Sequence, residues 1–205
     1  GDGDGAQRLR AALESGEGLK SLVFATNDLA GAHRRFERVG LTPETITVRE
    51  NWRSFRLDTA KTRSVRLFVL ERVGGAEAAP GESLGLDHIV IRTSDADGAA
   101  ALYGARLGLD MRLDRDVAGR RLMFFRCGDA IVEIVHDASL TSGHDQFWGL
   151  SWRVADAEAA RARLASAGLD VSEVRAGMKP GTRVFTVRDK TCGVPTLMIE
   201  VSRRD

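Results

Sequence analysis

A motif that occurs three times along the chain constrains the fold more than any other feature of the sequence. The three copies cover residues 19–40, 86–108 and 149–168. Each copy opens with a short run rich in Val, Ile, Leu or aromatic residues, which is typical of a strand. Repetition of this kind indicates that one supersecondary unit is used several times. The sequence therefore predicts three copies of one small module.

An Asp and a Gly mark the two ends of a predicted helix in each copy. Asp accepts hydrogen bonds from the free amides of a helix's first turn, and Gly adopts the left-handed conformation that ends a helix. The segment between them is rich in Ala, Arg and Leu, which have high helix propensity. The pairs are Asp28 and Gly40, Asp95 and Gly108, and Asp156 and Gly168, which are 12, 13 and 12 positions apart.

Three further strand-like runs follow each helix, so the repeated unit is a strand, a helix and three strands. The runs lie at 45–48, 53–58 and 65–70, at 110–113, 121–126 and 130–136, and at 170–173, 183–188 and 195–202. The predicted domains are an N-terminal helix and lead-in (1–18), a first module (19–73), a linker (74–85), a second module (86–138), a connecting loop (139–148) and a third module (149–205).

Composition and charge exclude several classes of protein. The 205 residues carry 30 basic and 29 acidic side chains, so the formal charge of +1 gives no reason to expect nucleic-acid or membrane binding. No apolar run approaches the roughly 18 residues of a membrane span, and no leader pattern is seen. The two cysteines, Cys127 and Cys192, suit a reducing cytoplasm, with a single disulfide as the alternative. A cytoplasmic protein is therefore expected.

The modules resemble the vicinal oxygen chelate superfamily, which includes glyoxalase I, bleomycin-resistance proteins and extradiol dioxygenases. The resemblance is carried by Leu-Asp-His-Ile-Val-Ile at 86–91, by Ile-Val-Glu-Ile-Val at 131–135, and by the strand-turn-strand pattern at 183–200. It extends over about residues 19–202. It implies an α+β fold of repeated βαβββ modules, with paired curved mixed sheets around a cavity and helices outside.

The resemblance also implies a divalent metal held by one residue on the first strand and one on the last strand of each module. Carried over by position, it assigns His88 and Glu133 in the second module and Glu200 in the third. Gly149 stands where the family most often has His or Gln. The first module has Ser21 and, near the other position, Phe68, so it lacks both ligands. The first module would then pair with a module of another chain, which predicts a homodimer, or with a module that precedes Gly1.

Side-chain alternation along strands agrees with this assignment. His88 and Arg92 share one face of their strand, and the apolar face opposite is the natural seat for a helix. The same argument is applied to the last strand, where Leu197, Ile199 and Val201 oppose Glu200. We therefore expect His88 and Glu200 on the helix-free, more polar faces.

The predicted ligand set of His88, Glu133 and Glu200 suits a divalent ion such as Fe, Mn, Ni, Co or Zn. It is not the set of two histidines and one carboxylate that extradiol iron chemistry requires. Glu133 and Glu200 are also candidate catalytic groups, because a carboxylate that binds no metal can move a proton. The alternative for His88 is a structural histidine bonded to a neighbour, and the loop residue His144 is an alternative fourth ligand.

Three arginines are candidate substrate-binding residues, because a guanidinium group binds carboxylate or phosphate in a bidentate manner. They are Arg92, Arg153 and Arg183. Arginine is abundant in this chain, so ordinary ion pairs are the alternative for each.

Two classes of function remain, both in the cavity of the second and third modules. The first is a metal-dependent lyase, isomerase or dioxygenase-like enzyme that acts on a small oxygen-rich or aromatic compound. The second is a non-catalytic protein that binds or sequesters a small molecule without metal. His88, Glu133 and Glu200 favour the first class, whereas Gly149 and the ligand-free first module favour the second.

Overall fold

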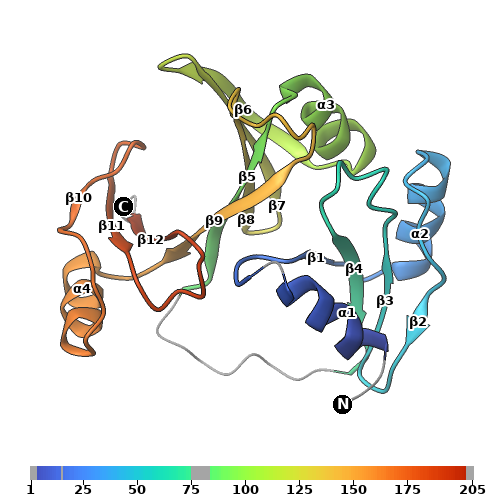
Figure 1. The fold of residues 1–205 in the computed structure, drawn as a ribbon, viewed down its shortest axis with the longest axis horizontal. Coiled ribbons are helices and arrows are strands. Elements are labelled where there is room, and N and C mark those ends of the chain that lie inside the picture. The colour runs from blue at the N-terminus through green and yellow to red at the C-terminus, as the bar shows by residue number, and fades with distance from the viewer. Residues whose placement is uncertain (1–3, 15, 75–83, 202–205) are drawn as a thin grey trace. The chain divides into compact units, whose positions relative to one another are not determined.

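The computed structural model describes residues 4–14, 16–74 and 84–201, and a βαβββ order occurs three times in it (Figure 1). This order confirms the predicted α+β fold of repeated modules. Helix α1 (Asp4–Glu14) comes first, and the first module has β1 (Leu22–Ala25), α2 (Leu29–Arg38), β2 (Thr47–Val48), β3 (Trp52–Arg56) and β4 (Leu67–Arg72). The second has β5 (Leu86–Thr93), α3 (Ala96–Ala100), the π-helix η1 (Ala101–Arg106), β6 (Asp110–Val117), β7 (Arg120–Cys127) and β8 (Ala130–His136). The third has β9 (Gln146–Arg153), α4 (Ala157–Ser166), β10 (Arg175–Ala176), β11 (Thr182–Val187) and β12 (Thr196–Val201).

The predicted helix ends are confirmed in all three modules. Each capping Asp accepts a hydrogen bond from the amide three residues later: Asp28 from Gly31, Asp95 from Gly98, and Asp156 from Ala159. Each closing glycine is left-handed, with φ of 71° at Gly40 and 76° at Gly108 and Gly168. The second module has one more residue between cap and stop, and its helix contains the π-helical turn η1, which accommodates an extra residue.

Most predicted strands are found within a few residues of their expected positions, but the strand predicted at 170–173 is wrong. Within that segment Val171 forms only an isolated bridge with Val187. Two backbone hydrogen bonds flank this bridge, from Ser172 N to Thr186 O and from Arg188 N to Asp170 O, each over 2.9 Å. On either side of this short pairing, side chains accept the next amides: Asp170 N donates to Asp189 Oδ1 and Thr186 N to Ser172 Oγ, each over 2.9 Å. Pairing therefore ends after one bridge, because side chains compete with the backbone for these amides.

The chain divides into two compact units. The middle unit contains residues 21–81 and 88–147, and the terminal unit contains residues 1–20, 82–87 and 148–205. Most of the predicted linker at 74–85 lies outside the described residues. No helix among the described residues has the length and apolar character needed to cross a bilayer. Cys127 and Cys192 are both free thiols, and the cytoplasmic location stays a prediction.

Two sheets form the middle unit, and each is covered by helix on one face. In the first module, the order is β1-β4-β3-β2, with α2 beside the sheet (Figure 1). Phe36 of α2 packs edge-on against Phe55 of β3. In the second module, the order is β5-β8-β7-β6. Tyr103 of η1 lies 6.0 Å from Phe125 of β7, measured between ring centroids. The side chains of this sheet that are buried on the helix side are Ile89, Ile91, Met123, Phe125, Val132 and Ile134.

The first two modules contact each other through the carboxyl ends of their helices. Arg106, at the end of η1, donates to Val39 O over 3.0 Å and to Gly40 O over 2.6 Å. In return, Arg35 of α2 donates to Leu107 O over 3.0 Å. The last carbonyls of a helix have no partner within the helix and carry partial negative charge. Each module therefore supplies a cation to the helix end of the other.

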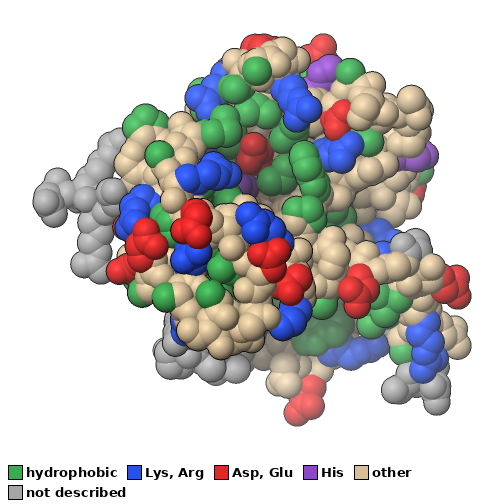
Figure 2. All heavy atoms as spheres, turned by 60° about the vertical axis from the view of Figure 1, so that its left-hand side comes forward, with side chains coloured by type: hydrophobic (Ala, Val, Ile, Leu, Met, Phe, Trp, Pro, Cys, Tyr) green, Lys and Arg blue, Asp and Glu red, His purple; other side chains and the backbone are tan. Residues whose placement is uncertain are grey.

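The terminal unit contains a sheet of order β10-β11-β12-β9 with α4 packed against it. Ala157, Phe185 and Val187 form the centre of the core beneath α4. The first residues of the β5 segment also belong to this unit, where Leu84 N donates to Arg153 O over 3.1 Å. On the face drawn in Figure 2, acidic and basic side chains are interspersed rather than separated by sign.

Candidate functional site

One face of the second module's sheet carries three of the predicted residues, His88, Glu133 and Arg92. Side chains alternate along strands, so this face is opposite the one that α3 and η1 cover. Residues paired across neighbouring strands share a face, which arranges the side chains in rows. Across β5, β8, β7 and β6, one row is Val90, Glu133, Phe124 and Leu113, and the next is Arg92, Val135, Leu122 and Arg115. We call this surface, together with His88 and Ile131, the helix-free face.

His88 and Glu133 lie side by side on the helix-free face. His88 Nε2 is 3.5 Å from Glu133 Oε2, and the two side chains are only 18% and 15% exposed. An imidazole beside a carboxylate in a half-buried position can transfer a proton or bind a polar group of a ligand. The same contact is also the one expected of a structural histidine bonded to a neighbour.

Arg92 lies on the same face and pairs with an aspartate at the end of β8. Its Nη2 is 2.6 Å from Asp137 Oδ2. Hydrogen bonds from Ser139, followed by the charges of Arg92 and Arg120, hold the pKa of Asp137 below its usual range. Two guanidinium groups therefore lie near a single carboxylate at this end of the face.

The third predicted ligand, Glu200, lies on the opposite face to the one expected. Its Oε2 accepts a hydrogen bond from Ala157 N, in the first turn of α4, over 2.7 Å. Arg183 Nη1 lies 3.4 Å from the same oxygen. The expectation that Glu200 occupies a helix-free face is wrong. Its carboxylate interacts with the free amides and the positive end of α4, an arrangement that stabilises a helix start.

Side-chain alternation predicted the wrong face for Glu200 because both faces of β12 carry apolar residues. Ile199 is 7% exposed on one face, while Met198 on the other packs against the core beneath α4. Phe185 and Val187 of the neighbouring strand β11 determine the choice, because they form that core. A single strand read by itself does not contain this information.

Strand register identifies the third-module residue that corresponds to the glutamate of the second. In the second module, His88 of β5 pairs with Ile131 of β8, and Glu133 lies two residues after Ile131. In the third module, Leu150 is level with Thr196, so Gly149 is level with Pro195. Two positions after Pro195 is Leu197. Leu197, rather than Glu200, therefore takes the place of the last-strand ligand.

Gly149 cannot be replaced by a ligand without a change in the backbone. A Cβ atom at this position would lie 2.8 Å from the carbonyl oxygen of Pro195, closer than such contacts normally come. That carbonyl is held in place, because it accepts a hydrogen bond from Leu150 N over 3.0 Å. The third module is thus built around a residue with no side chain at the position of its first ligand.

The residues of this chain do not fit the four-ligand metal site that the resemblance implies. In the order first strand then last strand, the modules present Ser21 and Phe68, His88 and Glu133, and Gly149 and Leu197. Within residues 4–14, 16–74 and 84–201, no three His, Cys, Asp or Glu side chains are grouped to hold an ion. Catalytic zinc sites typically have three protein ligands. At these six module positions the described residues supply two, His88 and Glu133.

The other two predicted substrate-binding arginines have partners within the terminal unit. Arg153 Nε donates to Asp87 Oδ1 over 3.1 Å and its Nη2 donates to Leu86 O over 2.8 Å. Arg183 Nη2 donates to Glu158 Oε1 of α4 over 2.7 Å. Arg183 therefore lies with Glu200 on the α4 side. Of the three arginines, Arg92 is the one found on the helix-free face of the second module.

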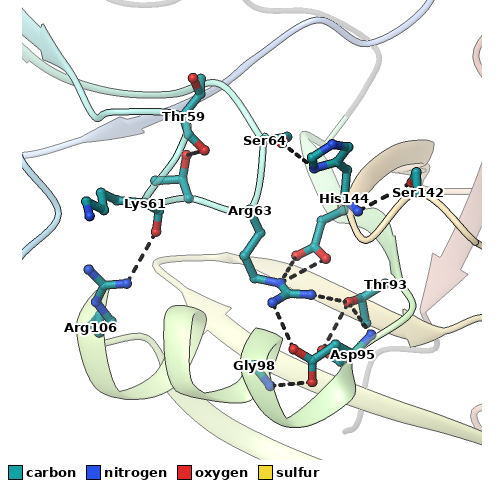
Figure 3. Close-up of polar contacts among 12 residues, drawn as sticks. Thr59, Lys61, Arg63, Ser64, Thr93, Asp95, Gly98, Arg106, Ser142 and His144 are labelled. Atoms are coloured by element: carbon teal, nitrogen blue, oxygen red, sulfur yellow. Dashed lines mark hydrogen bonds and ion pairs between the residues drawn. The ribbon is translucent and has the colours of Figure 1, made fainter.

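An ion-pair cluster that the sequence did not reveal joins the first module to the second (Figure 3). Arg63 Nε donates to both carboxylate oxygens of Asp145 over 3.0 Å. The other nitrogens of Arg63 donate to Asp95 Oδ2 over 2.9 Å and to Thr93 Oγ1 over 3.3 Å. The Asp145 side chain is fully buried, and this burial raises the pKa of its carboxyl despite the neighbouring guanidinium.

The alternative fourth ligand, His144, lies beside this cluster. Its Nδ1 is 2.7 Å from Ser64 Oγ of the first module. Arg63 and Ser64 both have positive φ, of 54° and 69°, so the loop adopts an uncommon conformation to present both side chains. Arg63 and Asp145 are 82 residues apart, and no spacing or motif in the sequence indicates such a pair.

Two surface cavities lie away from the predicted residues. The larger, of about 600 Å³, is in the first module and is lined by Thr42, Pro43, Glu44, Thr45, Arg56 and Asp58. The smaller, of about 270 Å³, lies at the start of α4 and is lined by Val154, Ala155, Asp156, Ala159, Ala160, Arg163 and Met198. Both are open to solvent, and neither contains the His88–Glu133 pair.

Comparison with known proteins identifies a family and a fold. Residues 85–195 match the model of the Glyoxalase/Bleomycin resistance protein/Dioxygenase superfamily. A methylmalonyl-CoA epimerase from Mycobacterium tuberculosis is similar in structure, with a TM-score of 0.53 and 22% identity over 62% of this chain and 94% of that one. A hypothetical protein from Bacillus halodurans C-125 gives 0.50 and 19% over 58% and 96%. At these identities the structural likeness shows the fold alone. No curated protein matches the sequence.

Proposed function

The chain belongs to the glyoxalase/bleomycin resistance protein/dioxygenase superfamily, and from this premise we propose that it binds a small molecule without a resident divalent metal ion. The binding surface is the helix-free face of the second module. His88 and Glu133 contact the ligand directly there, as hydrogen-bonding groups. The chain then acts as a binding or sequestration protein.

One observation carries this proposal: the two ligand positions of the third module hold Gly149 and Leu197, neither of which has a side chain that binds metal. Register places Leu197 at the position of the last-strand ligand, and the Pro195 carbonyl excludes a side chain at Gly149. The carboxylate of Glu200 is engaged with the first turn of α4. What remains is the single pair of His88 and Glu133, which is suited to binding a ligand group without metal.

The same pair favours the second candidate, a metal-dependent lyase, isomerase or dioxygenase-like enzyme. His88 Nε2 and Glu133 Oε2, 3.5 Å apart, present two donors from adjacent strands. A second chain would have to complete the ligand set for this candidate. The two candidates differ in whether the protein holds a metal ion, which can be measured directly.

The test is the metal content of untagged protein, measured by mass spectrometry after incubation with Mn, Fe, Co, Ni or Zn and removal of excess ion. We expect far less than one ion per chain in the wild type and no change in His88→Ala. The matched control is His136→Ala, because His136 alternates to the face opposite Glu133. One ion per chain in the wild type, lost in His88→Ala and kept in His136→Ala, would overturn the proposal and support the metal-dependent enzyme.

A further inference from the structure

The helix-free face has different chemistry at its two ends. At one end is the pair of His88 and Glu133. At the other end, Arg92 and Arg115 lie in one row across the sheet. Arg120 is two residues before Leu122, a member of that row, so it faces the same way in the row beyond. Arg92 and Arg120 both act on the Asp137 carboxylate at this end, and Arg115 lies on the same face of the sheet, on the edge strand β6.

The surface between the two ends is mostly apolar. Val90, Phe124 and Leu113 share the row of Glu133 and are at least partly exposed. Val135 and Leu122, in the row of Arg92 and Arg115, are only 7% and 8% exposed. Leu113 is 44% exposed, although it lies on the sheet beside a half-buried phenylalanine. Strands rise about 3.3 Å per residue, so Arg92 lies about 13 Å along β5 from His88.

We infer that the helix-free face binds an organic anion, with its acidic group between the arginines and its apolar body extending toward His88 and Glu133. This inference rests on the proposed function and names the ligand class of that same site. The charges support it, since three guanidinium groups and one carboxylate leave excess positive charge. Guanidinium groups bind carboxylate, sulfonate or phosphate oxygens through paired hydrogen bonds. Val90, Phe124 and Leu113, in the row of Glu133, supply the accessible apolar area that an aromatic or aliphatic body needs.

Two fluorescent probes with the same ring system test the inference on the full chain. 8-Anilinonaphthalene-1-sulfonate carries an acidic group, and N-phenyl-1-naphthylamine is the same molecule without it. We expect the sulfonate to bind at least about tenfold more tightly than the neutral probe, because hydrogen bonds to charged groups are strong. Its affinity should also fall as salt is added, since the arginines are partly exposed.

Substitutions then locate the binding and separate the two proposals. Arg115→Gln with Arg120→Gln should weaken the sulfonate about tenfold and leave the neutral probe unchanged, while Phe124→Ala should weaken both probes. Arg112→Gln is the control, because Arg112 is on β6 but pairs with Asp110. Equal affinity for the two probes, with Phe124→Ala still weakening both, would overturn the inference and leave the proposed binding face intact. If Phe124→Ala leaves the binding of both probes unchanged, the inference and the proposed binding face are both overturned.

Discussion

At the residue scale, Glu200 shows how one side chain can stabilise an element that is distant in the sequence. Its carboxylate accepts a hydrogen bond from the fully buried Ala157, 43 residues earlier, at the start of α4. Asp156 already caps this helix through Ala159 N. The first turn of α4 therefore has two acidic acceptors, which together satisfy amides that would otherwise lack partners.

We expect Glu200→Gln to lower the free energy of unfolding by less than about 1 kcal/mol, because an acceptor remains and only the charge is lost. Glu200→Leu should cost about 1–2 kcal/mol, since the Ala157 amide then has no acceptor. Urea unfolding measures both values. Glu158→Gln, which removes the exposed partner of Arg183, is the control and should have little effect. Equal losses in the two Glu200 variants would contradict a capping role.

Side chains whose hydrogen-bond partners were predictable differ from the others in how far away the partner lies along the sequence. Asp28, Asp95 and Asp156 were predictable because a cap bonds to an amide three residues away. Glu200 and Asp145 were not, because their partners are 43 and 82 residues away. The contact between His88 and Glu133 lies between these cases, since the family resemblance paired their strands.

At the element scale, η1 explains a difference in length that is visible in the sequence. The segment from capping Asp to closing Gly has one more residue in the second module than in the others. In the structure, Leu107 N donates to Leu102 O, five residues back, rather than four. A π-helical turn adds one residue while the rest of the helix keeps its orientation. Tyr103 and Leu107 both remain buried in this way.

Deleting Ala105, an exposed residue within η1, should therefore convert the helix to the length found in the other modules. We expect the protein to fold and to lose no more than about 1–2 kcal/mol of stability. Arg38 occupies the same position of α2, counted from its cap, and is also exposed. Because α2 has no extra residue, deleting Arg38 should destabilise the protein far more. Thermal unfolding followed by circular dichroism compares the two, and equal losses would contradict this account.

Element types were predictable from local pattern, whereas the orientation of β12 was not. The strand, helix and three strands of each module follow from periodicity and from helix ends. The face of β12 that α4 covers depends on Phe185 and Val187 in the adjacent strand. A strand with two apolar faces can be placed only when its neighbours are known.

At the scale of the whole molecule, the first module forms one compact unit with the second. Two kinds of contact join them: Arg106 and Arg35 bond to carbonyls at the ends of each other's helices, and Arg63 pairs with the buried Asp145. The first module thus has a structural partner within the chain. The homodimer expected through this module stays a prediction.

We expect Arg63→Met to lower the free energy of unfolding by about 3 kcal/mol at neutral pH, because it leaves a buried carboxylate without a cation. Burial already raises the pKa of Asp145 in the folded protein, so the native state binds this proton more readily than the unfolded chain. The stability linked to it is present below the unfolded pKa and is lost as the pH rises through the folded value. The loss in Arg63→Met should therefore shrink as the pH falls.

Urea unfolding at several pH values checks this expectation. Adding Asp145→Asn to Arg63→Met should restore much of the lost stability at neutral pH, because no buried charge remains. Arg34→Met, which changes an exposed residue of α2, is the control and should show little loss at any pH. A loss in Arg63→Met that does not change with pH would contradict the importance of the Asp145 charge.

Gly149 also has a consequence for how this protein can evolve. Any single substitution there places a Cβ atom against the carbonyl of Pro195, just before β12, which is held by its hydrogen bond from Leu150 N. A histidine or glutamine could be tolerated only after β12 had shifted, and the strand would then still need an acidic residue in place of Leu197. A descendant of this chain would need at least three coordinated changes before selection could act on a complete metal site. We therefore expect the lineage to diversify by changing the ligand that the face accepts, since such steps need only one substitution at a time.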